Sequence, residues 1–250
     1  MKKIKYLLLF TMTIFQLRVS GQLSQDILKK STHYFTLNEN GDLIGEGASI
    51  IKNRISESQF FLIGEQHNIQ KIEYFMHALI PILKNNNFTN YVTEIGPNAA
   101  NKLKQLDKQN IMLGDFNTDY SAFVGAAPFG FFGTKEEEIT LKKIKEFNID
   151  LLGIDFENYN SYIFLIDEIY KNSNKNKKIE SLYTEVRRLM ILEYERDKKG
   201  YSPILAKNIL ESEKFIIFLK EANNENNNLL IRELKKSLLI NREKGFFFYG

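Results

Sequence analysis

The stretch Gln59-Phe60-Phe61-Leu62-Ile63-Gly64 decides the fold that the sequence predicts. It is short and continuously apolar and ends at a glycine, with no alternation of polar and apolar residues. Continuous hydrophobicity is typical of a strand that is covered on both faces, as in a parallel sheet. A helix that Pro81 kinks or ends early is expected next, because apolar residues recur at the helical period: Ile69, Ile72, Met76, Leu79 and Leu83.

Strand and helix alternate along the following residues. A short helix is expected before the first strand, further strands at about residues 90–94 and 150–155, and more helices between and after them: residues 48–55 for the first, then 99–109, 134–147 and 161–170. Asn98 is the expected N-cap of the helix at 99–109, and Thr134 that of the next. This order predicts an α/β fold, a mainly parallel sheet flanked by helices and joined by right-handed crossovers.

The last third of the chain has a different pattern. A polar linker covers residues 171–178, and helices are expected at 179–198, 204–222 and 229–242, with a final strand at 246–249. The predicted organisation is therefore a signal peptide at 1–21, an α/β domain at 22–170, and a helical insertion or extension at 171–250. Chain termini generally lie exposed, so a buried strand at Gly250 indicates a truncated chain, with a natural edge strand as the alternative.

The first 21 residues have the pattern of a secretory signal peptide. Lys2, Lys3 and Lys5 form a basic region, and the apolar run at residues 6–15 is too short to span a bilayer. Cleavage is expected after Gly21, with an uncleaved N-terminal anchor as the alternative. No cysteine follows, which excludes a lipoprotein, so the protein is expected to be secreted or periplasmic and to touch the membrane only through this segment.

The charge balance gives no support for a nucleic-acid partner. The chain has 34 Lys and Arg against 31 Asp and Glu, a net charge of +3, and the segment 1–21 contains four of the basic residues and no acidic one. Its removal would leave 30 against 31, whereas nucleic-acid binding needs a basic face. Because there is no cysteine, zinc sites built on Cys, thiol nucleophiles and iron–sulfur clusters are excluded. A small-molecule substrate or ligand is the expected partner.

Residues 110–134 are expected to form a long loop that is rich in glycine and phenylalanine. Loops of this length are uncommon in compact domains and often form lids. The phenylalanines are expected to pack in a lid or in the core: Phe123, Phe129, Phe131 and Phe132. No Lys-Ser/Thr follows the glycines of this loop, so it is not a P-loop. The chain also lacks a Gly-x-Ser-x-Gly elbow, so an ordinary serine hydrolase is not expected.

Acidic residues and one histidine follow the three expected strands. Glu65 and His67 follow the first strand, Glu94 ends the second, and Asp155 ends the third. Ligands of open α/β sheets bind outside the carboxyl ends of the strands, so these side chains are expected to converge there. A carboxylate beside an imidazole raises the pKa of the imidazole and fixes its tautomer, which makes a general base for water activation. The same groups could instead hold a divalent ion that generates hydroxide.

Each of these residues also has a purely structural interpretation. His67 could be a solvated residue at the start of its helix, and Glu94 and Asp155 could be acids that stabilise helix N-termini through the helix dipole. That interpretation is favoured for Glu157, which follows Asp155 by two positions. His77 is expected to be an ordinary half-buried histidine.

The motif Gly64-Glu65-Gln66-His67 resembles the Gly-Glu-x-His signature of the erythromycin-esterase-like, ChaN-like and Tiki/TraB-like superfamily. The sequences Thr93-Glu94-Ile95-Gly96-Pro97 and Leu152-Gly153-Ile154-Asp155 resemble the second and third acid-ended strands of that group. The resemblance covers about residues 43–157. It implies an α/β fold and, by position, a catalytic pair at Glu65 and His67 with Glu94 as a third participant.

The functions that this resemblance implies are divided among hydrolases, metal-dependent proteases and haem-binding proteins. We expect an exported hydrolase in which Glu65 and His67 activate water to cleave an ester or related bond under the phenylalanine-rich lid. Glu94 would help to position the water, and Asp155 would support the site. The alternatives are a ChaN-like haem- or metal-binding uptake protein without turnover, and a scaffold with a decayed site. A bound metal, with Glu65, His67 and Glu94 as its ligands, a haem, or no cofactor all stay open. The further histidine that the family places near its C-terminus would lie beyond Gly250.

Overall fold

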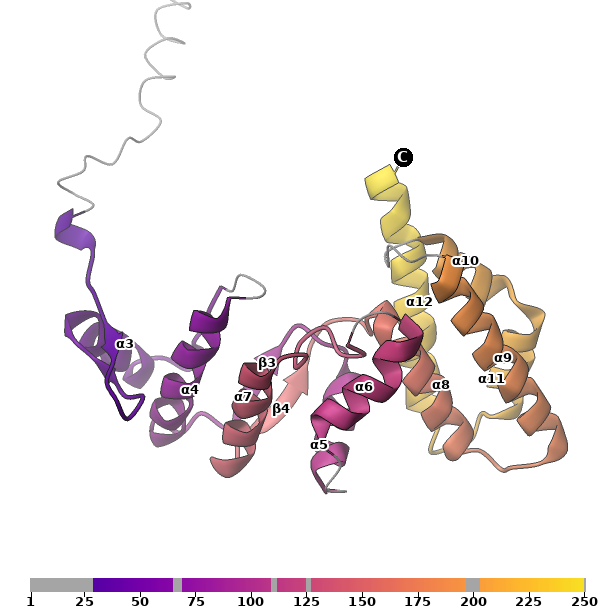
Figure 1. Cartoon of the computed structure of the whole chain (residues 1–250), viewed down its shortest axis with the longest axis horizontal. Coiled ribbons are helices and arrows are strands. Elements are labelled where there is room, and N and C mark those ends of the chain that lie inside the picture. The colour runs from indigo at the N-terminus through magenta and orange to yellow at the C-terminus, as the bar shows by residue number, and fades with distance from the viewer. Residues whose placement is uncertain (1–28, 65–68, 109–111, 125–126, 197–202, 250) are drawn as a thin grey trace, which may run out of the picture. The chain divides into compact units, whose positions relative to one another are not determined.

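The computed structural model describes residues 29–64, 69–108, 112–124, 127–196 and 203–249 of the chain. Of these residues, 65% lie in helices and only 6% in strands. The strands form two separate two-stranded sheets (Figure 1). The expected α/β fold with a mainly parallel sheet is therefore wrong, and the chain is mostly helical. It divides into two compact units, residues 1–58 and 59–250.

The N-terminal unit contains a short hairpin. Strands β1 (Thr36–Leu37) and β2 (Leu43–Ile44) pair in antiparallel orientation. In the turn between them, the side-chain oxygen of Asn38 accepts hydrogen bonds from the backbone N–H groups of Asn40 (3.0 Å) and Asp42 (2.8 Å). An Asn side chain that bonds nearby backbone donors is a standard way to stabilise a tight turn.

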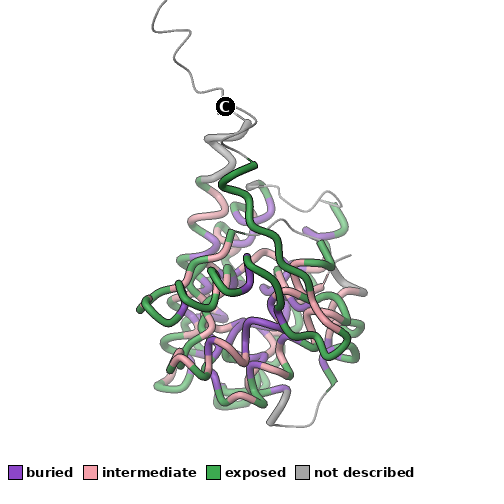
Figure 2. The backbone as a smooth tube through the Cα atoms, turned by 90° about the vertical axis from the view of Figure 1, so that its left-hand side faces the viewer, coloured by how far each residue is buried: buried purple, intermediate pink, exposed green. Residues whose placement is uncertain are grey.

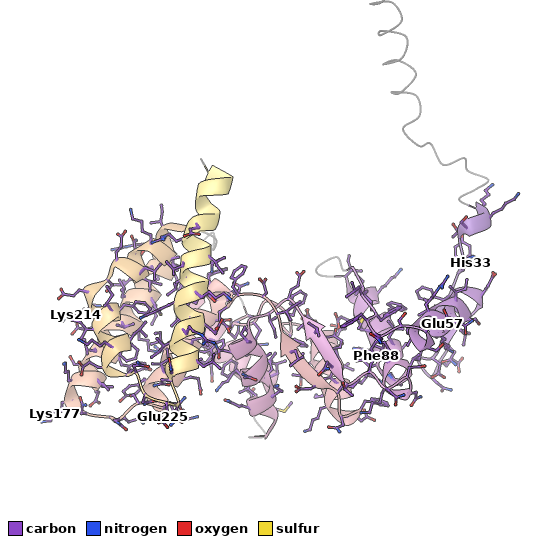
Figure 3. The ribbon with its side chains drawn as sticks, turned by 180° about the vertical axis from the view of Figure 1, so that it is seen from behind. His33, Glu57, Phe88, Lys177, Lys214 and Glu225 are labelled. Carbon is purple, nitrogen blue, oxygen red and sulfur yellow. The ribbon has the colours of Figure 1, made fainter. Side chains whose placement is uncertain are left out.

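Helix α3 (Glu46–Ser56) completes this unit and confirms the helix expected over residues 48–55. It buries Ala48 and Ile55. Ahead of the hairpin, Nδ1 of His33, which Figure 3 labels, lies 3.1 Å from Glu46 Oε1, and both side chains are exposed.

The second unit contains the one parallel strand pair of the described chain. Strands β3 (Asn90–Thr93) and β4 (Asp150–Gly153) confirm two of the expected strands, with slightly shorter bounds. The strand expected at residues 59–63 is wrong, because these residues pair with no strand that the structure describes. Phe60 is 82% exposed and Leu62 is 91% exposed, so this apolar run is not covered on both faces as its composition indicated.

The helices that lead into the two strands pack against each other: α4 (Gln70–Asn85) precedes β3 and α7 (Lys135–Glu146) precedes β4. Helix α4 continues past Pro81 for another turn, so the early end considered for it does not occur. At the start of α7, Thr134 Oγ1 accepts from the backbone N–H of Glu137 (3.2 Å), whose carboxylate accepts from that of Thr134 (2.8 Å). This capping box confirms the predicted helix start.

The long loop expected at residues 110–134 contains a helix of 12 residues. Helix α5 (Pro97–Lys108) follows β3, and α6 (Leu113–Val124) occupies much of the expected loop. Phe129 and Phe132, which follow α6, are only 2% and 3% exposed and belong to the hydrophobic core. These two phenylalanines therefore pack in the core, which is one of the two roles expected for them, and a lid over a substrate stays a prediction.

Helix α8 (Tyr162–Lys171) lies at the centre of the core. Its first five residues, 162–166, are all buried, which is typical of a helix surrounded by other elements on every side. Elsewhere buried and exposed stretches alternate along the described chain (Figure 2). The ring of Phe164 packs on those of Phe116 and Phe129, with centroids 5.9 Å and 5.4 Å apart. The helix expected at residues 161–170 is confirmed, and aromatic packing explains its burial.

The C-terminal third is helical, as expected. Helices α9 (Lys177–Arg196), α10 (Pro203–Glu211), α11 (Glu213–Glu221) and α12 (Asn228–Tyr249) pack together and around α8. The single helix expected at 204–222 is two helices, because Ser212 ends one and caps the next. The strand expected at 246–249 is wrong, since α12 continues through these residues.

Ion pairs join side chains on the solvent-facing sides of these helices. Lys214 of α11, labelled in Figure 3, lies 3.2 Å from Glu185 of α9. Lys178 of α9 lies 2.9 Å from Glu221 of α11. None of the helices among the described residues combines the length and the apolar character that a membrane span requires.

Candidate functional site

The carboxyl ends of β3 and β4 lie side by side, because the strands are parallel and Thr93 is opposite Gly153. Hydrogen bonds continue the pairing past both strands. The N–H of Ile154 donates to the carbonyl of Thr93 (3.3 Å), and that of Asp155 donates to the carbonyl of Ile95 (3.1 Å). We call residues 94–99 and 153–157 together the strand-exit junction.

Two of the four predicted site residues lie in this junction. Glu94 directly follows β3, Asp155 lies two residues beyond β4, and both are exposed. One carboxylate oxygen of Asp155 accepts from the backbone N–H of Phe156 (2.8 Å). The structure therefore brings Glu94 and Asp155 to the same solvent-facing edge of the sheet. Glu65 and His67 lie outside the described residues.

Two glycines allow the turns after β3 and β4 to approach each other closely. A Cβ atom on Gly153 would lie well inside 3.0 Å of the carbonyl oxygens of Ile95 and Gly96. One on Gly96 would overlap the carboxyl group of Glu157 in the same way. At both positions the lack of a side chain provides the space for this approach. The two turns therefore form one tightly packed body.

The buried side chain of Glu157 connects the two turns by hydrogen bonds. It is completely buried, and its two carboxylate oxygens accept hydrogen bonds from the backbone N–H groups of Asn98 (2.7 Å) and Ala99 (3.3 Å). These amides belong to the first turn of α5, where N–H groups have no partner within the helix. Asn98 was the predicted N-cap, which is wrong: the helix begins at Pro97, and Glu157 caps it from another part of the chain.

The same residue connects the junction to helix α12. The backbone N–H of Glu157 donates to Ser237 Oγ (2.8 Å), and this hydroxyl donates to the carbonyl of Glu233 (2.8 Å). Burial raises the pKa of the Glu157 carboxyl to about 7, although the amides of Asn98 and Ala99 oppose this shift; the negative charge of Glu233 adds to it. The carboxyl therefore changes its charge near neutral pH. Because it is buried, its direct effect is on the junction and not on a molecule in solvent.

Sequence reasoning had given Glu157 a smaller role than Asp155. One signal for it was present: α5 opens with Pro97 and Asn98 and has no acidic residue in its first turn. Proline is favoured at the first helical position, where its missing N–H costs nothing, but the amides that follow still need an acceptor. The sequence showed that an acceptor was needed, and only the fold identifies it as Glu157.

His77, the histidine that the structure describes in this unit, is packed and not part of the junction. His77 Nε2 lies 3.0 Å from the backbone carbonyl oxygen of Glu136, and its ring meets the edge of Tyr74 at a centroid distance of 6.0 Å. This agrees with an ordinary half-buried histidine. It makes His77 a suitable control residue for experiments on His67.

Among the described residues, no group of three or more His, Asp or Glu side chains is arranged to hold a metal ion. The expected ligand set of Glu65, His67 and Glu94 includes two residues outside that part of the chain, so it stays a prediction.

No family model, curated protein or solved structure matches this chain. The resemblance to the erythromycin-esterase-like superfamily therefore depends on the sequence motifs alone.

Proposed function

We propose that the protein is a hydrolase in which Glu65 and His67 activate water to cleave an ester or related bond. The observation that carries this proposal is the parallel pairing of β3 and β4, which brings Glu94 and Asp155 to one exposed edge. The motif Gly64-Glu65-Gln66-His67 comes earlier in the same unit of the chain. In general base catalysis an imidazole accepts the proton, and a nearby carboxylate stabilises the positive charge that forms on it.

In the proposed reaction, His67 is the general base. Its imidazole takes a proton from water while the oxygen attacks the carbonyl carbon, and Glu65 stabilises the imidazolium that forms. The tetrahedral intermediate then collapses, and the leaving alcohol takes the proton back from His67. Glu94 orients the water, and Asp155 supports the turn beside it. All the atoms come from water and the ester, so no further reactant is needed.

The packing of the junction supports this role for Glu94. Catalytic groups must be held close to their productive positions by the residues around them. The turn that carries Glu94 is packed against Gly153 and tied to Glu157 through the amides that follow it. An exposed side chain on such a rigid turn is suited to hold a water molecule in place.

The sequence at residues 1–21 supports export, so the proposed site of action is outside the cytoplasm. The proposed substrate is a small molecule with an ester or similar bond.

Turnover of a panel of nitrophenyl esters tests the proposal. We expect His67→Ala to lower kcat/KM by about 100-fold or more, the usual contribution of a general base. The matched control is His77→Ala, which removes an imidazole from a packed position in the same unit. Equal turnover by His67→Ala and the wild type, or no turnover by the wild type on any ester, contradicts the proposal.

A chelator separates the two forms of the mechanism. If a divalent ion held by Glu65, His67 and Glu94 generates the hydroxide, incubation with EDTA removes the activity, and added metal restores it. If His67 acts as the base without a metal, EDTA leaves the rate unchanged.

A further inference from the structure

Glu157 lies where three parts of the second unit meet. Its backbone continues from β4, its carboxylate accepts from the first turn of α5, and its N–H donates to Ser237 of α12. Residues 98 and 157 are distant in the sequence, so this one side chain fixes a tertiary contact and not only a local turn. The side chain is fully buried, which prevents water from replacing these hydrogen bonds.

The groups that face Glu157 do not neutralise its charge. On α12 the nearest charge is the carboxylate of Glu233, and on α8 the facing group is the buried Tyr162 hydroxyl, which accepts a hydrogen bond from Asn241. On α5, Lys102 lies one turn beyond Asn98, but its ammonium is 2.6 Å from Glu168. Within the described residues, no lysine or arginine forms an ion pair with Glu157.

We propose that the Glu157 side chain is a proton-controlled latch that joins the exit of β4 to helix α5, while its backbone N–H holds helix α12 in both protonation states. As a carboxylate it has two acceptor oxygens, one for the amide of Asn98 and one for that of Ala99. When a proton from solvent binds, one oxygen becomes a hydroxyl donor and no longer accepts well. The bond to Ala99 is lost, because at 3.3 Å it is the longer of the two.

The acidity of the group places this change in the neutral range. An ordinary glutamate ionises near the model value of 4.5, whereas burial moves the pKa of Glu157 to about 7. Above this pH the amides of Asn98 and Ala99 in the first turn of α5 would therefore both have an acceptor, and below it only that of Asn98 would. The turn that carries Glu94 directly precedes these amides, so the latch controls how tightly that turn is held. The latch does not require that the protein is a hydrolase.

Two NMR measurements on the full chain test the latch. In the first, the chemical shift of the side-chain carboxyl carbon of Glu157 is followed as the pH changes. We expect a midpoint near 7, which corresponds to proton binding roughly 300-fold tighter than in an ordinary glutamate. A midpoint below about 5 overturns the proposal.

In the second, hydrogen exchange of the Ala99 amide is compared with that of Leu103, in the interior of the same helix. Protection of Ala99 relative to Leu103 is expected to fall by roughly tenfold as the pH is lowered through the midpoint, because the charge-assisted hydrogen bond of the Ala99 amide is lost. Glu157→Gln should show no such pH response. Relative protection that stays constant in the wild type overturns the latch.

The matched control is Glu137→Gln, since Glu137 also caps a helix N-terminus but lies in contact with solvent. This variant should keep the wild-type pH response of Ala99. Loss of the response in this control would overturn the assignment to Glu157. If Glu157→Gln does not fold, the titration of the Glu157 carboxyl in the wild type decides alone whether the latch exists.

Discussion

Replacing Gly96 with alanine tests the packing of the strand-exit junction most severely. The added methyl group would overlap the carboxyl group of Glu157, at a separation that real Cβ atoms essentially never show. Glu157 is completely buried, so its side chain has no space to move into without opening the core. The variant must therefore either shift the turn at residues 94–97 or displace the carboxylate from the start of α5.

The expected cost follows from these two responses. Forcing a methyl group into a packed interior costs about 1–3 kcal/mol. Displacing the carboxylate weakens its hydrogen bonds to Asn98 and Ala99, and hydrogen bonds to a charged group are worth about 1.5–3 kcal/mol each. Because one of the two bonds is long and some relaxation will occur, we expect a loss of about 3 kcal/mol. This is a large fraction of the roughly 5–15 kcal/mol that stabilises a typical domain.

Urea denaturation followed by circular dichroism measures this loss. Gly114→Ala is the matched control, because Gly114 lies in α6 and a Cβ there meets no atom within 4 Å. Alanine is the better helix former, so this control should gain about 0.5 kcal/mol. In a Glu157→Ala background the overlap is relieved, and Gly96→Ala should then cost less than about 1 kcal/mol. A Gly96→Ala variant as stable as the wild type, or an equal cost in both backgrounds, would refute the packing argument.

Three further variants test other parts of the account. The pKa of Glu157 is near 7 in the folded chain and near 4.5 when unfolded, so the folded state binds the proton more tightly between these values and stability falls as pH rises through them. The fall amounts to up to roughly 3 kcal/mol, and denaturation at several pH values should show it in the wild type but not in Glu157→Gln. Lys102→Ala removes the ammonium that lies 2.6 Å from the partly buried carboxylate of Glu168. The free energy of unfolding, measured with urea, should fall by about 3 kcal/mol. An unchanged midpoint of urea denaturation would show that this ion pair does not stabilise the fold. Thr134→Ala removes the hydroxyl of the capping box and should lower the free energy of unfolding by about 1 kcal/mol, and an unaltered Tm would contradict the role of that cap.

Elements with a clear period or cap could be predicted from the sequence. The helix starting after Thr134 was predicted from its cap and its first-turn acids, and the structure has α7 there. Strands were predicted at about residues 90–94 and 150–155, and β3 and β4 lie there with slightly shorter bounds and pair in parallel as expected. The cap of α7 is a local interaction that the sequence shows directly, whereas the two strands also depend on their pairing with each other.

The errors occur where the outcome depends on distant contacts. Residues 59–63 form a short apolar run, which gives no period to test and becomes a strand only if another strand pairs with it. The same ambiguity applies to residues 246–249, which continue α12. Helix α6 was missed because glycine, asparagine and aspartate lower its intrinsic propensity, and burial of Leu113 and Phe116 in the core compensates for this.

Only part of the candidate site could be predicted from the sequence. Position at a strand end was enough to indicate Glu94 and Asp155, because parallel strands deliver their carboxyl ends to one edge. The role of Glu157 depends on amides near residue 98, and no local pattern reveals that contact.

The central functional claim is that His67 and Glu94 act on the same water molecule, and kinetics of the single and double variants test it most directly. We predict that His67→Ala lowers the kcat/KM of ester hydrolysis by about 100-fold or more. Adding Glu94→Gln should then cause little further loss, because residues that act as a unit are not additive. If His67→Ala keeps the wild-type rate, or if the two losses multiply in the double variant, the two residues do not share a site.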